Sequence, residues 1–124
     1  MKSIEAPKAP SAIGPYSQAI VSGGFLYLSG QIPLDPISGV IEASGIEDQT
    51  KQAISNIEAI LKAAGTSFER VVKTTCYLKD IGDFAAFNNV YAKAFTGKPA
   101  RSCVEVAALP KGALVEIEVI AEVG

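Results

Sequence analysis

The chain has 124 residues, of which 48% are hydrophobic and 19% are charged, and its formal net charge at pH 7 is −2. These values predict a single domain over residues 1–124 with a packed core, and they exclude a disordered tail. The sequence contains no histidine and only two cysteines, Cys76 and Cys103. This excludes His-dependent catalytic triads and zinc sites built from imidazoles or four thiolates, so we expect no bound metal.

The net negative charge offers no broad positive field for phosphates, so we expect no nucleic-acid partner. A mild local exception is the group of cations Lys93, Lys98, Arg101 and Lys111. Neither a phosphate-cradling P-loop nor a dinucleotide glycine fingerprint is present. No apolar run has the length of a signal peptide or a membrane span, so we expect a cytoplasmic protein with reduced thiols and no membrane partner.

The first 43 residues predict an extended arm, a β-hairpin and a loop. Residues 1–15 are rich in Ala and Pro and end in Ile-Gly-Pro, which is typical of a chain entering a turn. Residues 16–22 and 25–30 contain many strand formers, and the two glycines between them favour a tight hairpin turn. Residues 31–43 are interrupted by prolines and a glycine, and they indicate a short strand only weakly.

A long amphipathic helix is expected next. Apolar residues recur at steps of three and four from Ile46 to Ala64, which is the period of one helix face. Ser44 and Glu47 have the spacing of a capping box at its start, and Gly65 is a typical stop signal.

The rest of the chain predicts a strand, a second helix and two further strands. The strand is expected over residues 70–78, the helix over about 83–95, and the last strands over 101–106 and 114–122. The apolar face of the strand 70–78 is expected to carry Val72, Thr74, Cys76 and Leu78. The second helix is expected to bury Phe84, Phe87, Tyr91 and Ala94.

This order of elements predicts an α+β sandwich, with two helices packed on one face of a mixed sheet. The other face of the sheet would be lined with Glu, Lys, Thr and Tyr. Such a face is either exposed to water, as is common for antiparallel sheets, or it is a contact surface between subunits.

Three residues that could carry chemistry, Arg101, Cys103 and Glu105, share one face of their strand by its two-residue period. An arginine at the start of a strand can present its planar fork to a carboxylate through two parallel hydrogen bonds. The alternative for Arg101 is an ordinary surface salt bridge to Glu116 or Glu118.

Glu116 and Glu118 share the polar face of the last strand. If that strand pairs antiparallel with residues 101–106, one of the two carboxylates approaches Arg101 or Cys103. A carboxylate beside a bound substrate can orient a water molecule and shuttle protons in a hydrolysis without a metal. The alternative is a pair of outward surface glutamates.

Two further residues have open interpretations. A nucleophilic role for Cys103 has no histidine to support it, so we interpret Cys103 as a small wall residue. Asn88 lies at the edge of the second helix's apolar face, where it either hydrogen-bonds into a pocket or caps loop backbone.

Several segments, in order along nearly the whole chain, resemble the signature segments of the RidA (YjgF) family. The Arg-Ser-Cys-Val-Glu-Val segment is the most specific of them. The segments are Ala12–Ala19, Ser29–Pro33, Val72–Thr75, Pro99–Val106, Leu109–Lys111 and Val115–Glu118.

The resemblance implies a chorismate-mutase-like α+β fold in a homotrimer, whose three sheets form an inner barrel and whose active sites lie between subunits. It implies hydrolysis of 2-iminopropanoate and 2-iminobutanoate, released by pyridoxal-phosphate-dependent dehydratases, to 2-keto acids and ammonia. No cofactor is implied. A non-catalytic trimer that binds 2-keto acids or regulates a partner is the alternative; ribonuclease and chorismate-mutase activities are less favoured.

The resemblance also implies roles for single residues. Arg101 would bind the substrate carboxylate, and Glu116 would orient the attacking water and transfer protons. Two departures, Ala108 in place of a common arginine and a short segment 96–98, leave the preferred substrate open. The pocket-lining residues that the resemblance implies are Tyr16, Ser29, Gly30, Asn88 and Cys103.

Overall fold

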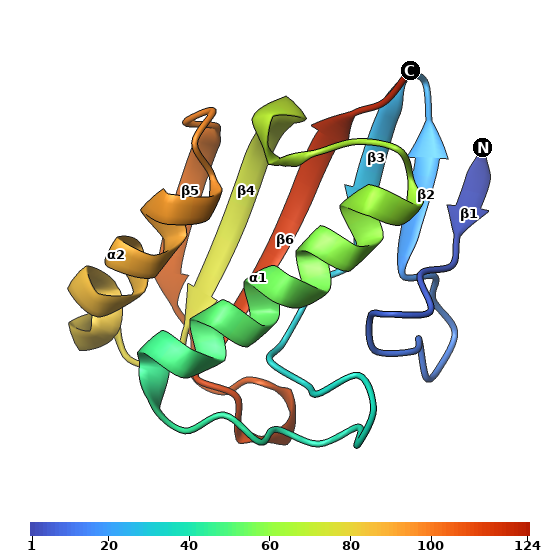
Figure 1. Cartoon of the computed structure of the whole chain (residues 1–124). Coiled ribbons are helices and arrows are strands. Elements are labelled where there is room, and N and C mark those ends of the chain that lie inside the picture. The colour runs from blue at the N-terminus through green and yellow to red at the C-terminus, as the bar shows by residue number, and fades with distance from the viewer.

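Six strands form one mixed sheet, and both helices lie against the same face of it in the computed structural model, which describes all 124 residues (Figure 1). The strand order across the sheet is β1-β2-β3-β6-β4-β5. The predicted α+β sandwich with two helices on one face is therefore confirmed. In chain order the elements are β1 (Lys2–Ile4), β2 (Ala19–Ser22), β3 (Phe25–Leu28), α1 (Gly45–Ala63), β4 (Val71–Leu78), α2 (Phe84–Ala94), β5 (Ala100–Glu105) and β6 (Val115–Glu122).

The predicted hairpin is present, with shorter strands than expected. β2 and β3 pair antiparallel, and Ser22 faces Phe25 across a two-residue turn. Gly23 and Gly24 both have positive φ, +61° and +84°. A two-residue turn of this kind requires left-handed backbone at both positions, which glycine adopts without a steric penalty.

The antiparallel pairing of the last two strands, the condition under which Glu116 or Glu118 would approach Arg101 or Cys103, does not occur. β5 lies at the edge of the sheet and pairs only with β4, in parallel, while β6 lies between β3 and β4. The physical reason is the connection through α2, because a helical crossover returns the chain to run parallel to the strand it left. β4 therefore separates Arg101 from the glutamates of β6.

The apolar face of β4 differs from the prediction at one residue. Thr74, Cys76 and Leu78 are buried as expected, but Val72 is 38% exposed and Val71 is buried instead. The register of β4 against β6 shifts between Val71 and Lys73, which marks a β-bulge. One extra residue in a strand moves its neighbour to the other face.

The start of α1 is also built differently from the prediction. The Ser44 side chain makes no capping hydrogen bond. Gly45 has φ +82°, so the regular helix begins after a non-helical residue and the capping-box geometry is lost. Gln49 holds the start of α1 in place instead, because its side chain donates a hydrogen bond to the Ala43 carbonyl and accepts one from the Leu114 amide.

The chain between β3 and α1 forms no strand. Only Gln31 pairs, through a single bridge to Ile117 of β6, and buried Asn56 of α1 donates to the carbonyls of Ile32 and Leu34. In α2, Phe87 and Tyr91 are buried, whereas Phe84 and Ala94 are only partly buried. No helix in the structure combines the length and the hydropathy that crossing a membrane requires.

Candidate active site

Arg101 lies on the helix-covered side of the sheet. It is the register partner of buried Thr74 across β4 and β5, and side chains of paired residues point to the same side of a sheet. Its Nη1 donates to Oδ1 of Asn88 at 2.7 Å, and its guanidinium carbon lies 4.7 Å from the Tyr91 ring centre and 5.4 Å from that of Phe84. Arg101 is thus held against α2.

No carboxylate of the chain neutralises Arg101. The one ion pair in the structure joins Lys62 and Glu58 on α1, at 3.9 Å, so the alternative of a surface salt bridge from Arg101 is excluded. The guanidinium instead borders a hollow of about 560 Å³ between α2 and the start of β5. Eight residues line this hollow: Asn88, Tyr91, Ala92, Phe95, Thr96, Lys98, Pro99 and Arg101.

Glu116 lies on the opposite face of the sheet from Arg101. Its β6 neighbours Val115 and Ile117 are fully buried beneath the helices, and strand alternation turns Glu116 to the helix-free side. There it faces Tyr77, whose hydroxyl donates to Glu118 at 2.8 Å. The possible approach of a β6 glutamate to Arg101 is therefore not realised within one chain.

Glu116 is partly buried beside the chain segment that follows β3. Gln31 exchanges two backbone hydrogen bonds with Ile117, at 2.8 and 3.1 Å, which holds Gly30 against β6. A Cβ at Gly30 would collide with the Glu116 carboxylate, so glycine is required for this approach. Burial raises the pKa of Glu116, and the neighbouring charge of Glu118 raises it further.

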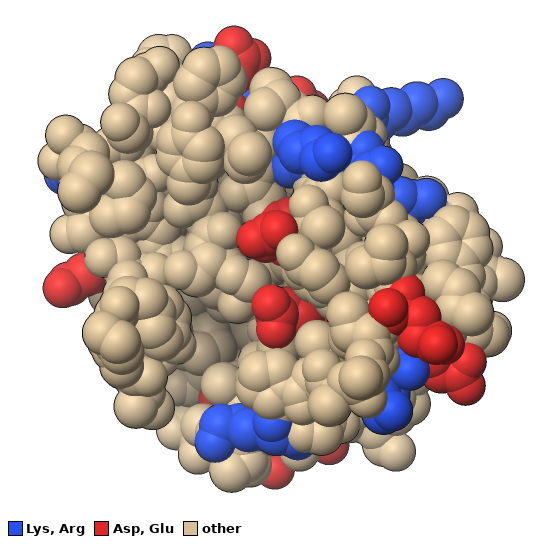
Figure 2. Space-filling view, turned by 180° about the vertical axis from the view of Figure 1, so that it is seen from behind, with Lys and Arg blue, Asp and Glu red and all other residues tan.

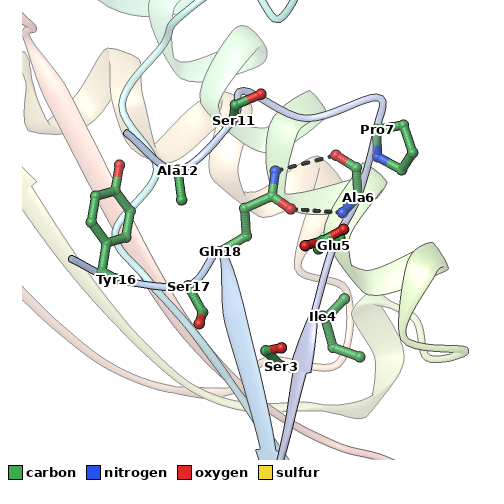
Figure 3. A pocket seen from close by; sticks show the side chains of 10 residues that line it. All are labelled: Ser3, Ile4, Glu5, Ala6, Pro7, Ser11, Ala12, Tyr16, Ser17 and Gln18. Carbon is green, nitrogen blue, oxygen red and sulfur yellow. Dashed lines mark hydrogen bonds between the residues drawn. The ribbon is translucent and has the colours of Figure 1, made fainter. Parts of the chain in front are cut away.

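Ser29 and Tyr16 lie next to this segment. The Ser29 hydroxyl donates to the Ser17 carbonyl at 2.6 Å, so the chain around Tyr16 is held close to Ser29. Tyr16 is half-exposed and borders a second hollow of about 500 Å³ under the N-terminal arm (Figure 3). Buried Gln18 closes that hollow, because its amide bonds both the N–H and the carbonyl of Ala6.

The predicted site residues therefore form two separate groups in one chain. The Arg101 group lies between α2 and β5, and the Glu116 group lies on the helix-free face and the segment after β3. The Arg101 group consists of Asn88, Arg101 and Cys103. The Glu116 group consists of Tyr16, Ser29, Gly30 and Glu116.

The two cysteines are free thiols on neighbouring strands. Cys76 and Cys103 are register partners across β4 and β5. Burial raises the pKa of Cys76 to about 12, and burial also raises the pKa of Cys103, although the charge of Arg101 opposes the shift at Cys103. A raised pKa keeps both sulfurs protonated near pH 7, which favours a wall role for Cys103 over a nucleophilic one.

Sequence reasoning treated Tyr91 and Thr74 only as core residues, although both lie beside Arg101. The signal available in the sequence was the spacing of Phe84, Asn88 and Tyr91, which places all three on one helix face. All three contact the Arg101 guanidinium. No three acidic or cysteine side chains gather closely enough to hold a metal ion.

The fold and the two groups of residues define a class of protein: a small α+β domain with a free guanidinium on one side of its sheet and a half-buried carboxyl on the other. The family model described as Endoribonuclease L-PSP matches residues 6–123. The chain belongs to this family, which is the RidA (YjgF) family that its segments resemble.

Three relatives illustrate this membership. A Lactococcus lactis protein with the name "Putative regulator AldR" is 56% identical over 124 residues, covering 99% of this chain and 98% of AldR. A goat (Capra hircus) protein named 2-iminobutanoate/2-iminopropanoate deaminase is 52% identical, covering 98% and 89%. The crystal structure of E. coli TdcF with bound serine superposes with a TM-score of 0.94 at 42% identity, covering 100% of both chains.

Proposed function

We propose that this chain is a deaminase that hydrolyses small 2-imino acids, such as 2-iminopropanoate and 2-iminobutanoate, to 2-keto acids and ammonia. The observation that carries the proposal is Arg101, a guanidinium fixed against α2 beside a hollow and without a carboxylate of the chain on it. An arginine fork in that state suits the carboxylate of a small acid. The name of the goat relative and the serine bound to TdcF agree with such a ligand.

The separation of the two groups bears on the assembly. Because Arg101 and Glu116 lie on opposite faces of one sheet, one chain does not bring both to the same small molecule. We therefore propose a homotrimer, in which the Arg101 group of one subunit meets the Glu116 group of the next. The helix-free face suits such a contact, since it is mostly uncharged with acidic groups near its middle (Figure 2) and exposes Tyr27 and Val104.

The proposed chemistry needs only the chain's own side chains. Arg101 would hold the substrate carboxylate, which places the adjacent C=N carbon for attack. Glu116 would take a proton from water as the water oxygen bonds to that carbon, and return the proton to nitrogen, which gives a carbinolamine. The hydroxyl proton of the carbinolamine would then pass by way of Glu116 to nitrogen as the C–N bond breaks, so that ammonia leaves and a C=O group remains. A raised pKa suits a carboxyl that both accepts and donates protons in this way.

The test is the release of ammonia and 2-keto acid when a pyridoxal-phosphate-dependent threonine or serine dehydratase generates the imine in the same solution. We expect the chain to accelerate 2-keto acid formation and to compete with semicarbazide, which traps free imine. Size exclusion with light scattering should give the mass of a trimer. If the chain does not accelerate 2-keto acid formation, the proposed deaminase activity is refuted. If the chain is a monomer at micromolar concentration, the proposed site between subunits is refuted.

A non-catalytic regulator is the second candidate, and the relation to AldR favours it. A measurement of imine turnover distinguishes the two candidate functions. A regulator binds a 2-keto acid at the Arg101 group without accelerating imine hydrolysis, whereas the deaminase does both. A ribonuclease is less suited, because the chain has no histidine and carries a net charge of −2.

A further inference from the structure

Tyr91 of α2 lies directly against the guanidinium of Arg101. The guanidinium carbon is 4.7 Å from the Tyr91 ring centre, and Asn88 accepts a hydrogen bond from Nη1 at 2.7 Å. A guanidinium stacks on an aromatic face through its own flat plane, so the ring constrains the tilt of that plane. The bond to Asn88 fixes one end of the fork. Together with the Phe84 ring at 5.4 Å, these two contacts restrict the orientation of the guanidinium.

The Tyr91 ring is itself held in place by its neighbours. Its hydroxyl lies 2.7 Å from the Thr74 hydroxyl in a buried hydrogen bond. The Phe95 ring stacks on it at 4.3 Å between centres, with 20° between the planes. Thr74 is fully buried and is the register partner of Arg101. The hydroxyl bond therefore ties the ring to the strand residue beside the arginine that the ring contacts.

Core packing alone does not explain this hydroxyl pair. A phenylalanine and a valine would fill almost the same volume, and they would bury no polar group that needs a partner. The pair joins α2 to β4 beside Arg101, because Thr74 is the register partner of Arg101 and the Tyr91 ring lies against its guanidinium. A bonded hydroxyl restricts how far an aromatic ring can slide or turn.

We propose that Tyr91 and Thr74 are positioning residues that set the plane of the Arg101 guanidinium, so that the part of the fork not bonded to Asn88 faces the substrate carboxylate. This inference rests on the proposed function, in which Arg101 binds that carboxylate. Thr74 lies outside the hollow, whereas Tyr91 borders it beside Arg101. In this role both residues act through Arg101.

The orientation of the guanidinium can be measured without turnover. The chain has only two arginines, Arg70 and Arg101, so NMR of protein labelled with ¹³C,¹⁵N-arginine reports few guanidinium signals. Arg70 is an internal control, because its Nη1 contacts only the exposed Gly124 carbonyl. In the wild type we expect slowed rotation about the Nε–Cζ bond of Arg101. In Tyr91→Leu we expect faster rotation at Arg101 and unchanged signals from Arg70.

The same variants test the reaction. Tyr91→Leu is expected to lower kcat/KM by roughly 10- to 100-fold, since misplacement by about 1 Å can cost that much. The double variant Thr74→Val/Tyr91→Phe keeps the shape, removes both hydroxyls and is expected to lose roughly 5-fold, the equivalent of one hydrogen bond. Leu26→Ala is the packing control, because it removes a fully buried side chain of β3, a strand that β6 and β4 separate from Arg101. Phe87 is unsuitable as a control, because its ring packs on Tyr91 at 5.5 Å between centres.

A double-mutant cycle that combines Tyr91→Leu with Arg101→Lys distinguishes a positioning role of Tyr91 from a packing role. An ammonium has no plane to orient, so Tyr91→Leu should add little further loss in the lysine background. Equal losses in both backgrounds, or a loss in Leu26→Ala as large as that in Tyr91→Leu, would reduce Tyr91 to a core residue. Unchanged Arg101 signals in Tyr91→Leu would overturn the positioning role of Tyr91 and leave the proposed function standing. Wild-type turnover in Arg101→Ala would instead overturn the carboxylate clamp, even if the NMR signals change as expected.

Discussion

Replacing Gly30 with alanine tests the placement of Glu116 directly. A Cβ built on Gly30 lies 2.8 Å from Cδ and 3.0 Å from Cγ of Glu116 and overlaps a carboxylate oxygen, whereas ordinary contacts begin at 3.4 Å. The carboxylate therefore has to withdraw by roughly 1 Å to reach van der Waals distance. A displacement of about 1 Å in a reacting group can cost on the order of 100-fold in rate. We expect kcat/KM for imine hydrolysis to fall by about that factor.

The same change should hardly alter the stability. Gly30 does not have a positive φ, so alanine fits the backbone and restricts the unfolded chain, which stabilises by about 0.4–1 kcal/mol. An off-rotamer Glu116 side chain costs about 0.5–1.5 kcal/mol. The two effects nearly cancel. Loss of activity should therefore occur without a loss of folded protein.

The assay compares the initial rate of 2-keto acid formation from dehydratase-generated imine with thermal unfolding of the same preparation. Gly82→Ala is a matched control, because a Cβ there would also press on a carboxylate, that of Asp80 at 3.0 Å, outside both groups of site residues. Gly82→Ala should retain wild-type activity. Wild-type rates for Gly30→Ala would refute the reasoning, since the reaction would then tolerate a displaced Glu116.

Four further predictions concern the other proposed roles. Arg101→Ala should lower kcat/KM by roughly 10- to 150-fold, because charge-assisted hydrogen bonds are worth about 1.5–3 kcal/mol. Steady-state kinetics on folded protein measures this loss. Arg101→Lys should also have a lower kcat/KM, because lysine lacks the two-pronged guanidinium. Glu116→Gln should bind a 2-keto acid, measurable by calorimetry, yet turn over slowly; full activity would assign the proton transfers elsewhere. Because burial raises the pKa of Glu116 above its ordinary 4.5, the folded chain binds more protons than the unfolded chain as the pH rises from 4.5 through the raised pKa. Denaturant titrations should therefore show the wild type losing stability relative to Glu116→Gln across that window, and a constant difference would contradict the shift. Cys103→Ser should keep a substantial part of the activity, because burial keeps the thiol protonated; complete loss in a folded variant would make the sulfur a reactant.

The local elements were predictable because their signals lie within short stretches of the chain. Two glycines between strand-forming runs specify a tight hairpin, and the apolar period from Ile46 onward specifies α1. Two local predictions were wrong because contacts or backbone geometry outside the sequence pattern decided the outcome. Val72 is turned outward by a bulge against β6, and the capping box at Ser44 is absent because of the backbone at Gly45.

The sequence and the family resemblance proposed the members of the candidate site but not their arrangement. The segment around Arg101 identified the family, and through it Arg101, Glu116 and the residues near them. Only the structure shows that α2 brings Asn88 and Tyr91 onto Arg101 while Glu116 lies on the far face. Pairing partners of strands depend on the path of the connecting helix, which no residue pattern within a strand records.

The sequence by itself therefore determined the α+β class, most element positions and the family, and it proposed the residues that would hold an acid and move a proton. These properties follow from periodicity and from side-chain chemistry, both of which are local. The tertiary structure alone decided that β4 separates β5 from β6, and hence that Arg101 and Glu116 point away from each other. The reason is physical: strand order and facing are set by long-range pairing, and side chains alternate strictly once that pairing is made.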